Sequence, residues 1–171
     1  MKIIKITLLN SLIILLLTVA LFAFSALSFA QDYKVKKVGK TFSHPWGISV
    51  FGKNEVLITE RGGNLFKVNI KNGSRLKISN LPEVYNVRQG GLLDVLIDKE
   101  SVSERNVYIC YSSRVAGGSS TTLMAGTLKE NKLISKKILF KSNNVSESGV
   151  HFGCRLAILN DDIFMSIGDR G

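Results

Sequence analysis

From residue 31 onward the chain consists of short apolar runs separated by segments rich in Gly, Asn, Asp and Lys. Brief hydrophobic runs bounded by turn residues are typical of β-strands, and no long stretch repeats with the period of a helix. Segments such as 61–64 and 71–74 supply the glycines and asparagines that tight hairpin turns require. The pattern therefore predicts an all-β fold. The predicted strands span residues 46–50, 56–59, 65–68, 75–78, 91–97, 106–111, 123–128, 136–140, 155–158 and 163–167.

The predicted strands group into two sets of four and a third set of which only two strands are present. Residues 164–171 repeat residues 56–62 with one inserted residue, and both segments end in an acidic residue, Arg and Gly. Repeated four-stranded units of roughly 40 to 50 residues are the sequence signature of a β-propeller. The alternative is a β-sandwich in which this similarity is accidental. We predict about two and a half blades of a propeller.

An open stack of blades leaves one apolar face of each terminal blade in water, because propeller blades are normally covered on both sides. We therefore expect this chain to fold poorly by itself. We also expect it to be the N-terminal part of a protein about twice as long, truncated at residue 171.

The first 30 residues have the features of a secretion signal. Lys2 and Lys5 precede an uncharged, mostly apolar stretch, which closes with Ala-Leu-Ser-Phe-Ala before Gln31. We predict a signal peptide over residues 1–30, cleavage before Gln31, and a mature domain over residues 31–171 in the periplasm or outside the cell. The alternative is an uncleaved membrane anchor, since the stretch is long enough to span a bilayer.

The net charge and the cysteines exclude few classes of function. Without the two lysines of the signal segment, the chain has 21 basic and 13 acidic residues, a net charge of +8. These charges are scattered, which favours a solvated surface over a nucleic-acid interface. Cys110 and Cys154 are the only cysteines. They show no zinc-ligand spacing, and their redox state stays open.

Three polar segments lie next to predicted inner strands, where the channel of a propeller opens. They contain Gln89, His151 and Asp169. A histidine can act as a base near neutral pH, and a carboxylate can orient a histidine, although each residue alone is also compatible with a structural role. His44 precedes Pro45, so we expect it in an extended strand and not in a site.

Several sequence segments, taken together, resemble a known family. This is the glucose/sorbosone dehydrogenase family, the soluble aldose sugar dehydrogenases that depend on pyrroloquinoline quinone (PQQ). The segments are residues 44–48, 57–63, 89–95, 151–156 and 167–171. They occur in the family's order, so the resemblance covers nearly all of the mature chain but only the first part of the family's six-bladed propeller.

The resemblance implies oxidation of an aldose at its anomeric carbon to a lactone, with hydride transfer to PQQ and later electron transfer to an external acceptor. His151 corresponds to the base that takes the hydroxyl proton. Gln89 and Arg155 belong to the substrate and cofactor pocket, and Asp169 fixes the orientation of the histidine ring. The residues that bind the carboxylates of PQQ, and the ligands of a Ca²⁺ ion, would come from later blades, so we expect no metal ligands in this part and no activity from it alone.

Two positions depart from the pattern of the family. Cys154 lies where we expect glycine or serine, and Arg88 precedes the glutamine where a histidine is common. The pocket shape and the sugar therefore stay open. The competing hypotheses are a non-catalytic β-propeller that serves as a binding module, and a decayed enzyme, because a propeller fold does not determine function.

Overall fold

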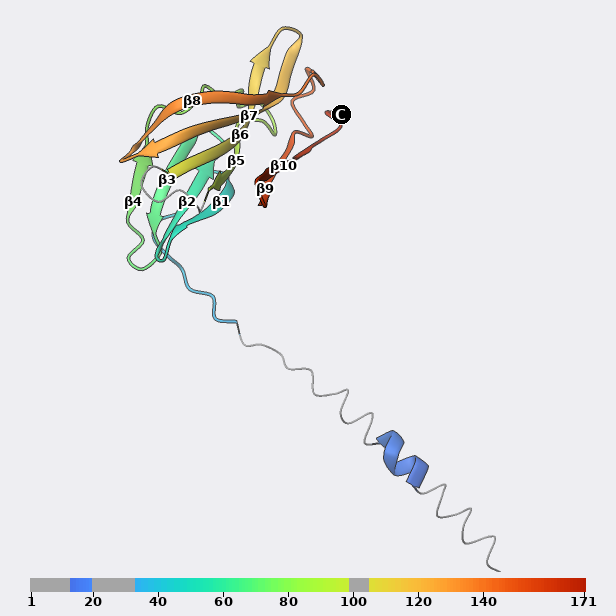
Figure 1. Ribbon diagram of the computed structural model, residues 1–171. Coiled ribbons are helices and arrows are strands. Elements are labelled where there is room, and N and C mark those ends of the chain that lie inside the picture. Colours follow the sequence, from blue (N-terminus) through green and yellow to red (C-terminus); the bar gives the residue numbers. More distant parts are fainter. Residues whose placement is uncertain (1–12, 20–32, 99–104) are drawn as a thin grey trace, which may run out of the picture. The chain divides into compact units, whose positions relative to one another are not determined.

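The computed structural model describes residues 13–19, 33–98 and 105–171 (Figure 1). The chain forms two compact units, Met1–Lys37 and Val38–Gly171. In the first unit residues 13–19 are helical. The rest of the predicted signal segment, and its cleavage site before Gln31, lie outside the described residues. Within the described ranges, no helix is both long and apolar enough to cross a membrane.

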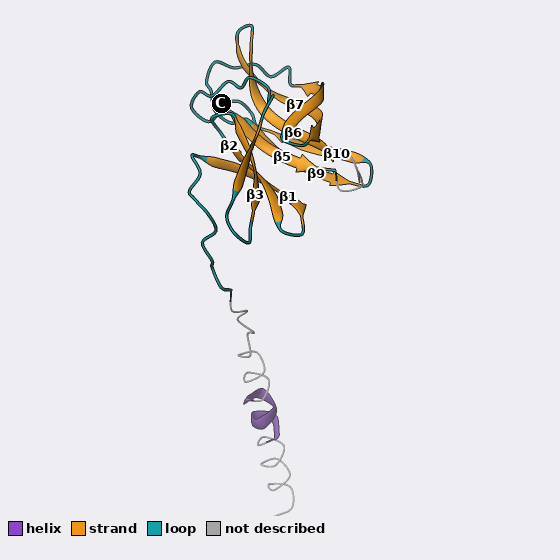
Figure 2. Ribbon diagram, turned by 90° about the vertical axis from the view of Figure 1, so that its left-hand side faces the viewer, coloured by secondary structure: helices purple, strands orange, loops and turns teal. Residues whose placement is uncertain are grey.

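The second unit consists of three antiparallel sheets in chain order, ordered β1-β2-β3-β4, β5-β6-β7-β8 and β10-β9. This grouping confirms the predicted sets of four, four and two strands. The first strands of the three sheets, β1, β5 and β9, lie next to one another (Figure 2). The strands are β1 (Pro45–Gly52), β2 (Glu55–Glu60), β3 (Asn64–Asn69), β4 (Arg75–Ile78), β5 (Leu92–Ile97), β6 (Arg105–Val115), β7 (Gly118–Lys129), β8 (Lys132–Lys141), β9 (Gly153–Leu159) and β10 (Asp162–Ile167).

The hairpin of β6 and β7 is longer than the sequence pattern predicts. The expected strands end at Tyr111 and resume at Leu123, but the pairing continues without interruption from Arg105↔Leu128 to Val115↔Gly118. The additional segment is rich in Ser and Thr, which resembles a loop. Its hydroxyls are nevertheless satisfied inside the protein: Thr121, for example, is fully buried and donates to the carbonyl of Phe152 at 3.0 Å.

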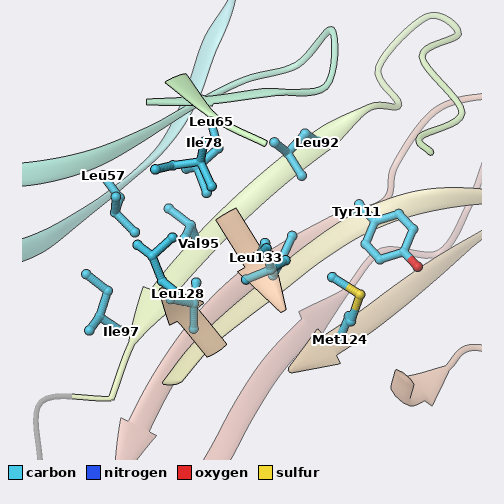
Figure 3. Packing of buried hydrophobic residues seen from close by; sticks show 12 residues of the cluster. Leu57, Leu65, Ile78, Leu92, Val95, Ile97, Tyr111, Met124, Leu128 and Leu133 are labelled. Atoms are coloured by element: carbon cyan, nitrogen blue, oxygen red, sulfur yellow. The ribbon is translucent and has the colours of Figure 1, made fainter. Parts of the chain in front are cut away.

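The larger apolar core lies between the first and second sheets (Figure 3). Leu57, Leu65 and Ile78 of the first sheet pack against residues of β5 to β8, including Val95 and Leu133. All of these side chains are less than 2% exposed. Because burying an aliphatic side chain of this size contributes about 1.5–3 kcal/mol, this cluster is the main reason the two sheets stay together.

A second, smaller core joins the second sheet to β9 and β10. It contains Leu93, Leu123, Phe152 and Leu156 together with the two cysteines. Leu93 faces this core while its neighbour Leu92 faces the larger one. Successive side chains of a strand point to opposite faces, so β5 is covered on both sides. It is therefore the central strand of the described fold.

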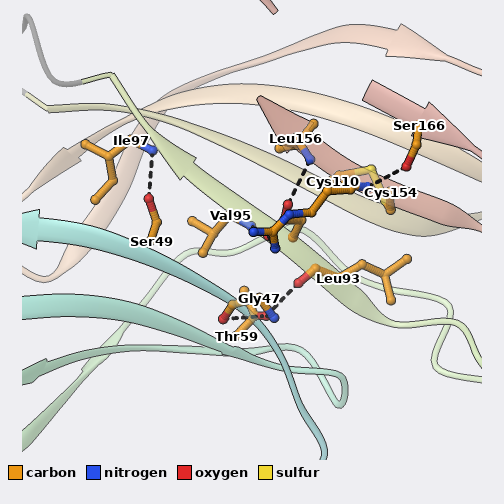
Figure 4. A network of polar contacts seen from close by, with 12 residues as sticks. Gly47, Ser49, Thr59, Leu93, Val95, Ile97, Cys110, Cys154, Leu156 and Ser166 are labelled. Atoms are coloured by element: carbon orange, nitrogen blue, oxygen red, sulfur yellow. Dashed lines mark hydrogen bonds and ion pairs between the residues drawn. A yellow bond between two sulfur atoms is a disulfide. The ribbon is translucent and has the colours of Figure 1, made fainter. Parts of the chain in front are cut away.

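Polar contacts also bind the three inner strands (Figure 4). Thr59 Oγ1 accepts the N–H of Gly47 at 2.7 Å and donates to Leu93 O at 2.6 Å. On the other side of β5, the buried Asp94 accepts the N–H of Leu156 through Oδ2 at 2.8 Å. These bonds fix the position of each inner strand relative to the next.

Cys110 and Cys154 form a disulfide, which answers the question that the sequence leaves open. The bond links β6 of the second sheet to β9 of the third (Figure 4), and both residues are fully buried. Cys154 has a φ of 79°, in the left-handed region that favours glycine. It lies three positions after His151, so the disulfide anchors the start of β9 close to that residue.

One face of the first sheet is open to solvent. Trp46, Ile48 and Val50 alternate along β1 and are 48%, 56% and 58% exposed. The residues between them face the second sheet, since Ser49 Oγ accepts the N–H of Ile97 at 3.3 Å. The exposed row is thus the side of β1 that points away from β5.

One acid-Arg-Gly segment begins at the last residue of β2 and the other follows β10, and they are not equivalent in the sheets. Glu60 pairs with Pro45 at the start of the first strand, whereas Asp169 lies beyond Ile167, which pairs with Gly153. Their environments differ accordingly, since Glu60 is 6% exposed and the Asp169 side chain is 81% exposed. The sequence repeat thus marks the same strand of two sheets without placing the acids in equivalent positions.

Candidate functional site

Three loops meet at one end of the inner strands. Gln89 precedes β5, His151 precedes β9 and Asp169 follows β10. The N–H of Gln89 donates to the carbonyl of Gly149 at 3.0 Å, and the N–H of His151 donates to Oε1 of Gln89 at 2.9 Å. The backbone before β9 is therefore held by the loop before β5.

His151 and Asp169 form a hydrogen-bonded pair. Nδ1 of His151 lies 2.7 Å from Oδ1 of Asp169, and the N–H of Gly171 donates to the same oxygen at 3.1 Å. These two bonds, first the one with His151 and then the one with Gly171, lower the pKa of Asp169 below its ordinary value of 3.8. The carboxylate is therefore ionised at neutral pH.

The ionised carboxylate determines which nitrogen of His151 carries the proton. A carboxylate only accepts hydrogen bonds, so Nδ1 of His151 must be the donor. In a neutral imidazole the other nitrogen, Nε2, then has a free lone pair. Such an arrangement can act as a general base through Nε2, because a carboxylate at Nδ1 would stabilise the imidazolium formed when Nε2 takes a proton.

The pair is accessible to small molecules. The His151 side chain is 53% exposed in the described chain. The adjacent amide of Gln89 uses its oxygen for the His151 backbone, which leaves the amide nitrogen as a donor. An imidazole and a hydrogen-bond donor are thus both present at this exposed surface.

The residues ahead of the inner strands share an unusual backbone conformation. His44, Arg88 and His151 have φ values of 49°, 52° and 51°. The left-handed region costs a residue with a side chain about 1–2 kcal/mol, and such conformations concentrate at functional sites. Our expectation of an extended His44 is wrong, because a left-handed turn directs its carbonyl to the N–H of Arg61 at 3.0 Å.

Arg155, the fourth residue predicted for the pocket, has a different partner. Its Nη1 lies 3.5 Å from Oδ1 of Asp94, and its side chain is 70% exposed. Within the described ranges no hydrogen bond joins it to Gln89, His151 or Asp169. The structure therefore brings together three of the four predicted residues, and the role of Arg155 in a pocket stays a prediction.

Sequence reasoning gave no role to two charged residues that the structure places close to the site. Asp94 is 3% exposed and bridges β5 and β9, and Arg170 is 1% exposed beside the His151 loop. Asp94 carries a usable signal, since an acid within an apolar strand is rarely left without partners. Arg170 follows a strand near Gly and Asp, where a charged residue is normally solvated, and no sequence signal distinguishes it.

Metal ligands do not cluster in the part of the chain that the structure describes. No group of three or more His, Cys, Asp or Glu side chains there is arranged to hold a metal ion.

The second unit of the chain, Val38–Gly171, is similar to known proteins over most of its length. The family model for glucose/sorbosone dehydrogenase matches residues 42–171. The aldose sugar dehydrogenase YliI of Escherichia coli is 30% identical over 132 residues, which cover 74% of this chain and 36% of that protein. The chain thus spans little more than a third of the length of the curated relatives it matches.

Solved structures share the fold. A glucose dehydrogenase crystal structure is similar with a TM-score of 0.74 and 29% identity, covering 81% of this chain and 42% of the other. The PQQ-bound aldose sugar dehydrogenase of Streptomyces coelicolor has a TM-score of 0.68 at 20% identity, with 81% and 42% coverage, and shows the fold alone.

These neighbours confirm that the three sheets are part of a β-propeller. The family model covers most of the chain, including Gln89, His151 and Asp169. The chain belongs to the glucose/sorbosone dehydrogenase family.

Proposed function

We propose that the protein is an exported quinoprotein oxidoreductase, in which these residues form part of the site that oxidises the anomeric hydroxyl of an aldose to a lactone. The observation that carries the proposal is the His151–Asp169 pair, with Gln89 beside it. Membership of the family supports the class of reaction, and the PQQ-bound Streptomyces relative supports the cofactor.

In this proposal Nε2 of His151 takes the proton of the anomeric hydroxyl. The C–H bond at the anomeric carbon breaks as the carbonyl of the lactone forms, and its hydrogen leaves with two electrons. When bound, PQQ supplies the acceptor for that hydride. Asp169 holds the ring so that Nε2 faces the substrate, and it stabilises the positive charge on the imidazolium. General-base catalysis of this kind typically contributes 10²- to 10⁴-fold.

The residues present fit one side of such a site. A quinone with several carboxylates requires hydrogen-bond donors and positive charge, and the loop before β5 offers the amide nitrogen of Gln89 next to the guanidinium of Arg88. Arg88 donates to Ser148 O at 3.1 Å through one nitrogen, and its remaining N–H groups would interact with an anionic ligand. We propose that these two residues would contact the cofactor, that Arg155 would belong to the same pocket, and that residues outside this part would hold a Ca²⁺ ion.

Export is a separate part of the proposal. It is supported by the signal pattern of residues 1–30 and by the disulfide, since structural disulfides persist mainly in oxidising compartments. The N-terminal sequence of protein recovered from the periplasm or medium tests it. We expect the mature chain to begin at Gln31, and an intact N-terminus at Met1 would contradict cleavage.

The catalytic proposal is tested by replacing His151 with Gln in the whole protein, loaded with PQQ and assayed for aldose oxidation with an artificial electron acceptor. We expect kcat to fall roughly 10²- to 10⁴-fold. His44→Gln is the matched control, because His44 is the other histidine of the chain and has the same backbone conformation. If His151→Gln keeps the full rate, His151 is not the base. If the wild type binds aldose but never oxidises it, the protein is a binding module.

A further inference from the structure

Arg170 is a buried cation, and among the residues that the structure describes its contacts include no carboxylate. Its side chain is 1% exposed. It donates to the carbonyl of Val150, and its Nη2 donates to Oγ of Ser119 at 2.9 Å and is 3.3 Å from Ser119 O. Its guanidinium lies 3.6 Å from the centre of the Phe152 ring, while Nε is buried without a partner. Burial lowers the pKa of this guanidinium.

This arrangement is costly for stability alone. Buried charges are usually paired with an opposite charge, and removing an ion from water without such a partner costs several kcal/mol. Carbonyls, a hydroxyl and an aromatic face recover part of that cost, the last by a cation–π interaction of about 2 kcal/mol when desolvated. An apolar side chain would fill the same space without the penalty, which suggests that the guanidinium serves another purpose.

The contacts of Arg170 surround the histidine. Val150 and Phe152 are the neighbours of His151 on either side, and Arg170 contacts both. Arg170 also follows Asp169 directly in the chain, and its own carbonyl accepts the hydroxyl of Ser148 at 2.5 Å. One side chain thus ties the backbone of the base to the backbone of the carboxylate that orients it.

The same contacts attach both loops to a rigid element. Ser119 belongs to β7 of the second sheet and is fully buried. The two loops that bear the reactive pair are therefore fixed to the long β6–β7 hairpin through the Arg170 guanidinium. Fixing such groups to rigid elements matters, because a misplacement of about 1 Å can cost roughly 10²-fold in rate.

We propose that Arg170 is a positioning residue, which sets the distance and orientation between His151 and Asp169 by clamping the residues on both sides of the histidine. Its effect on catalysis rests on the proposed function, whereas its effect on the geometry of the pair does not.

The geometry is tested without activity by labelling the protein with ¹⁵N-histidine. The signal lost in His151→Gln identifies the His151 imidazole in the whole protein, and the signal lost in His44→Gln identifies an internal reference. We expect the Nδ1 proton of His151, held by Asp169, to be protected from exchange in the wild type. In Arg170→Met, which keeps length but removes charge and donors, we expect its exchange to be at least tenfold faster, with partial restoration in Arg170→Lys.

The matched control is Arg61→Met. Arg61 lies in the corresponding acid-Arg-Gly segment after β2 and also has a buried Nε without a partner, but its backbone carbonyl and N–H contact Leu92 and His44 and not the His151 loop. We expect this variant to leave the His151 resonance unchanged. In the whole protein with PQQ, Arg170→Met should lower kcat roughly 10²-fold with little change in KM.

Two results would overturn the proposal. One is an unchanged His151 resonance in a folded Arg170→Met protein, and the other is an equal change in Arg61→Met. If Arg170→Met does not fold, Ser119→Ala and Phe152→Leu each remove one contact of the guanidinium, and they decide the matter by the same exchange measurement. A protein that shows the exchange effect but never oxidises aldose would refute the proposed function and leave the positioning role intact.

Discussion

Removal of the Cys110–Cys154 disulfide gives the most quantitative prediction for stability. The bond closes a loop with a sequence separation of 44. In the chain-entropy model, a cross-link over a loop of that size destabilises the unfolded state by about 4 kcal/mol. Because domains of this size typically have only about 5–15 kcal/mol of stability, loss of the bond removes a large fraction of it.

Two double variants separate the cross-link from the backbone at Cys154. Cys110→Ala with Cys154→Ala removes the bond, and we expect it to lower the free energy of unfolding by up to about 4 kcal/mol. Cys110→Ala with Cys154→Gly also removes the bond but suits the φ of 79° at this position. We expect the glycine version to be more stable than the alanine version by about 1 kcal/mol, since alanine is strained there.

Urea unfolding followed by circular dichroism measures both effects. The m-value should rise in both double variants, because an unfolded chain without the cross-link exposes more surface. A double-alanine variant within 1 kcal/mol of the oxidised wild type would refute the entropic argument. Equal midpoints for the alanine and glycine versions would show that the backbone at Cys154 is not strained.

Two further predictions concern single residues. A carboxyl titration by ¹³C NMR should place the pKa of Asp169 below 3.8, and His151→Phe should raise it, because the bond with His151 is the largest cause of the lowered value. The stabilisation from this pair is therefore present above pH 3.8 and is lost as the pH falls through the lowered pKa of Asp169. An unchanged Asp169 pKa in His151→Phe would contradict the attribution of the shift to His151. Gly91→Ala should destabilise the protein by several kcal/mol, since a Cβ there would lie 1.9 Å from Arg61 O at a φ of 138°. Gly52→Ala is its control, because the nearest atom to that Cβ is 3.9 Å away, and equal midpoints of thermal unfolding for the two variants would refute the prediction.

The strands could be predicted because each is a short apolar run, and segments rich in turn residues separate one run from the next. Where the prediction stopped short, the reason is physical. Thr121 lies within a run of Ser and Thr that resembles a loop. Only Phe152 O, in the loop before β9, provides the partner that makes its burial favourable. Local sequence contains no information about that partner.

The site was predicted through motif resemblance, and the geometry around it depends on contacts that the motif does not reveal. Gln89, His151 and Asp169 lie together because backbone bonds join their loops. The resemblance also implies a pocket role for Arg155, but it does not reveal that Oδ1 of the buried Asp94 lies 3.5 Å from Nη1 of Arg155. Arg170 was not predicted at all, because a charged residue after a strand is normally exposed.

The open face of β1 gives the protein a built-in optical reporter. Trp46 is the only tryptophan of the chain, and it lies in the exposed apolar row with Ile48 and Val50. Within residues 1–171, indole fluorescence therefore comes from this one surface. Whatever molecule or segment covers the row would exclude water from the indole and shift its emission to shorter wavelength, so that association at this face can be followed in solution without any added label.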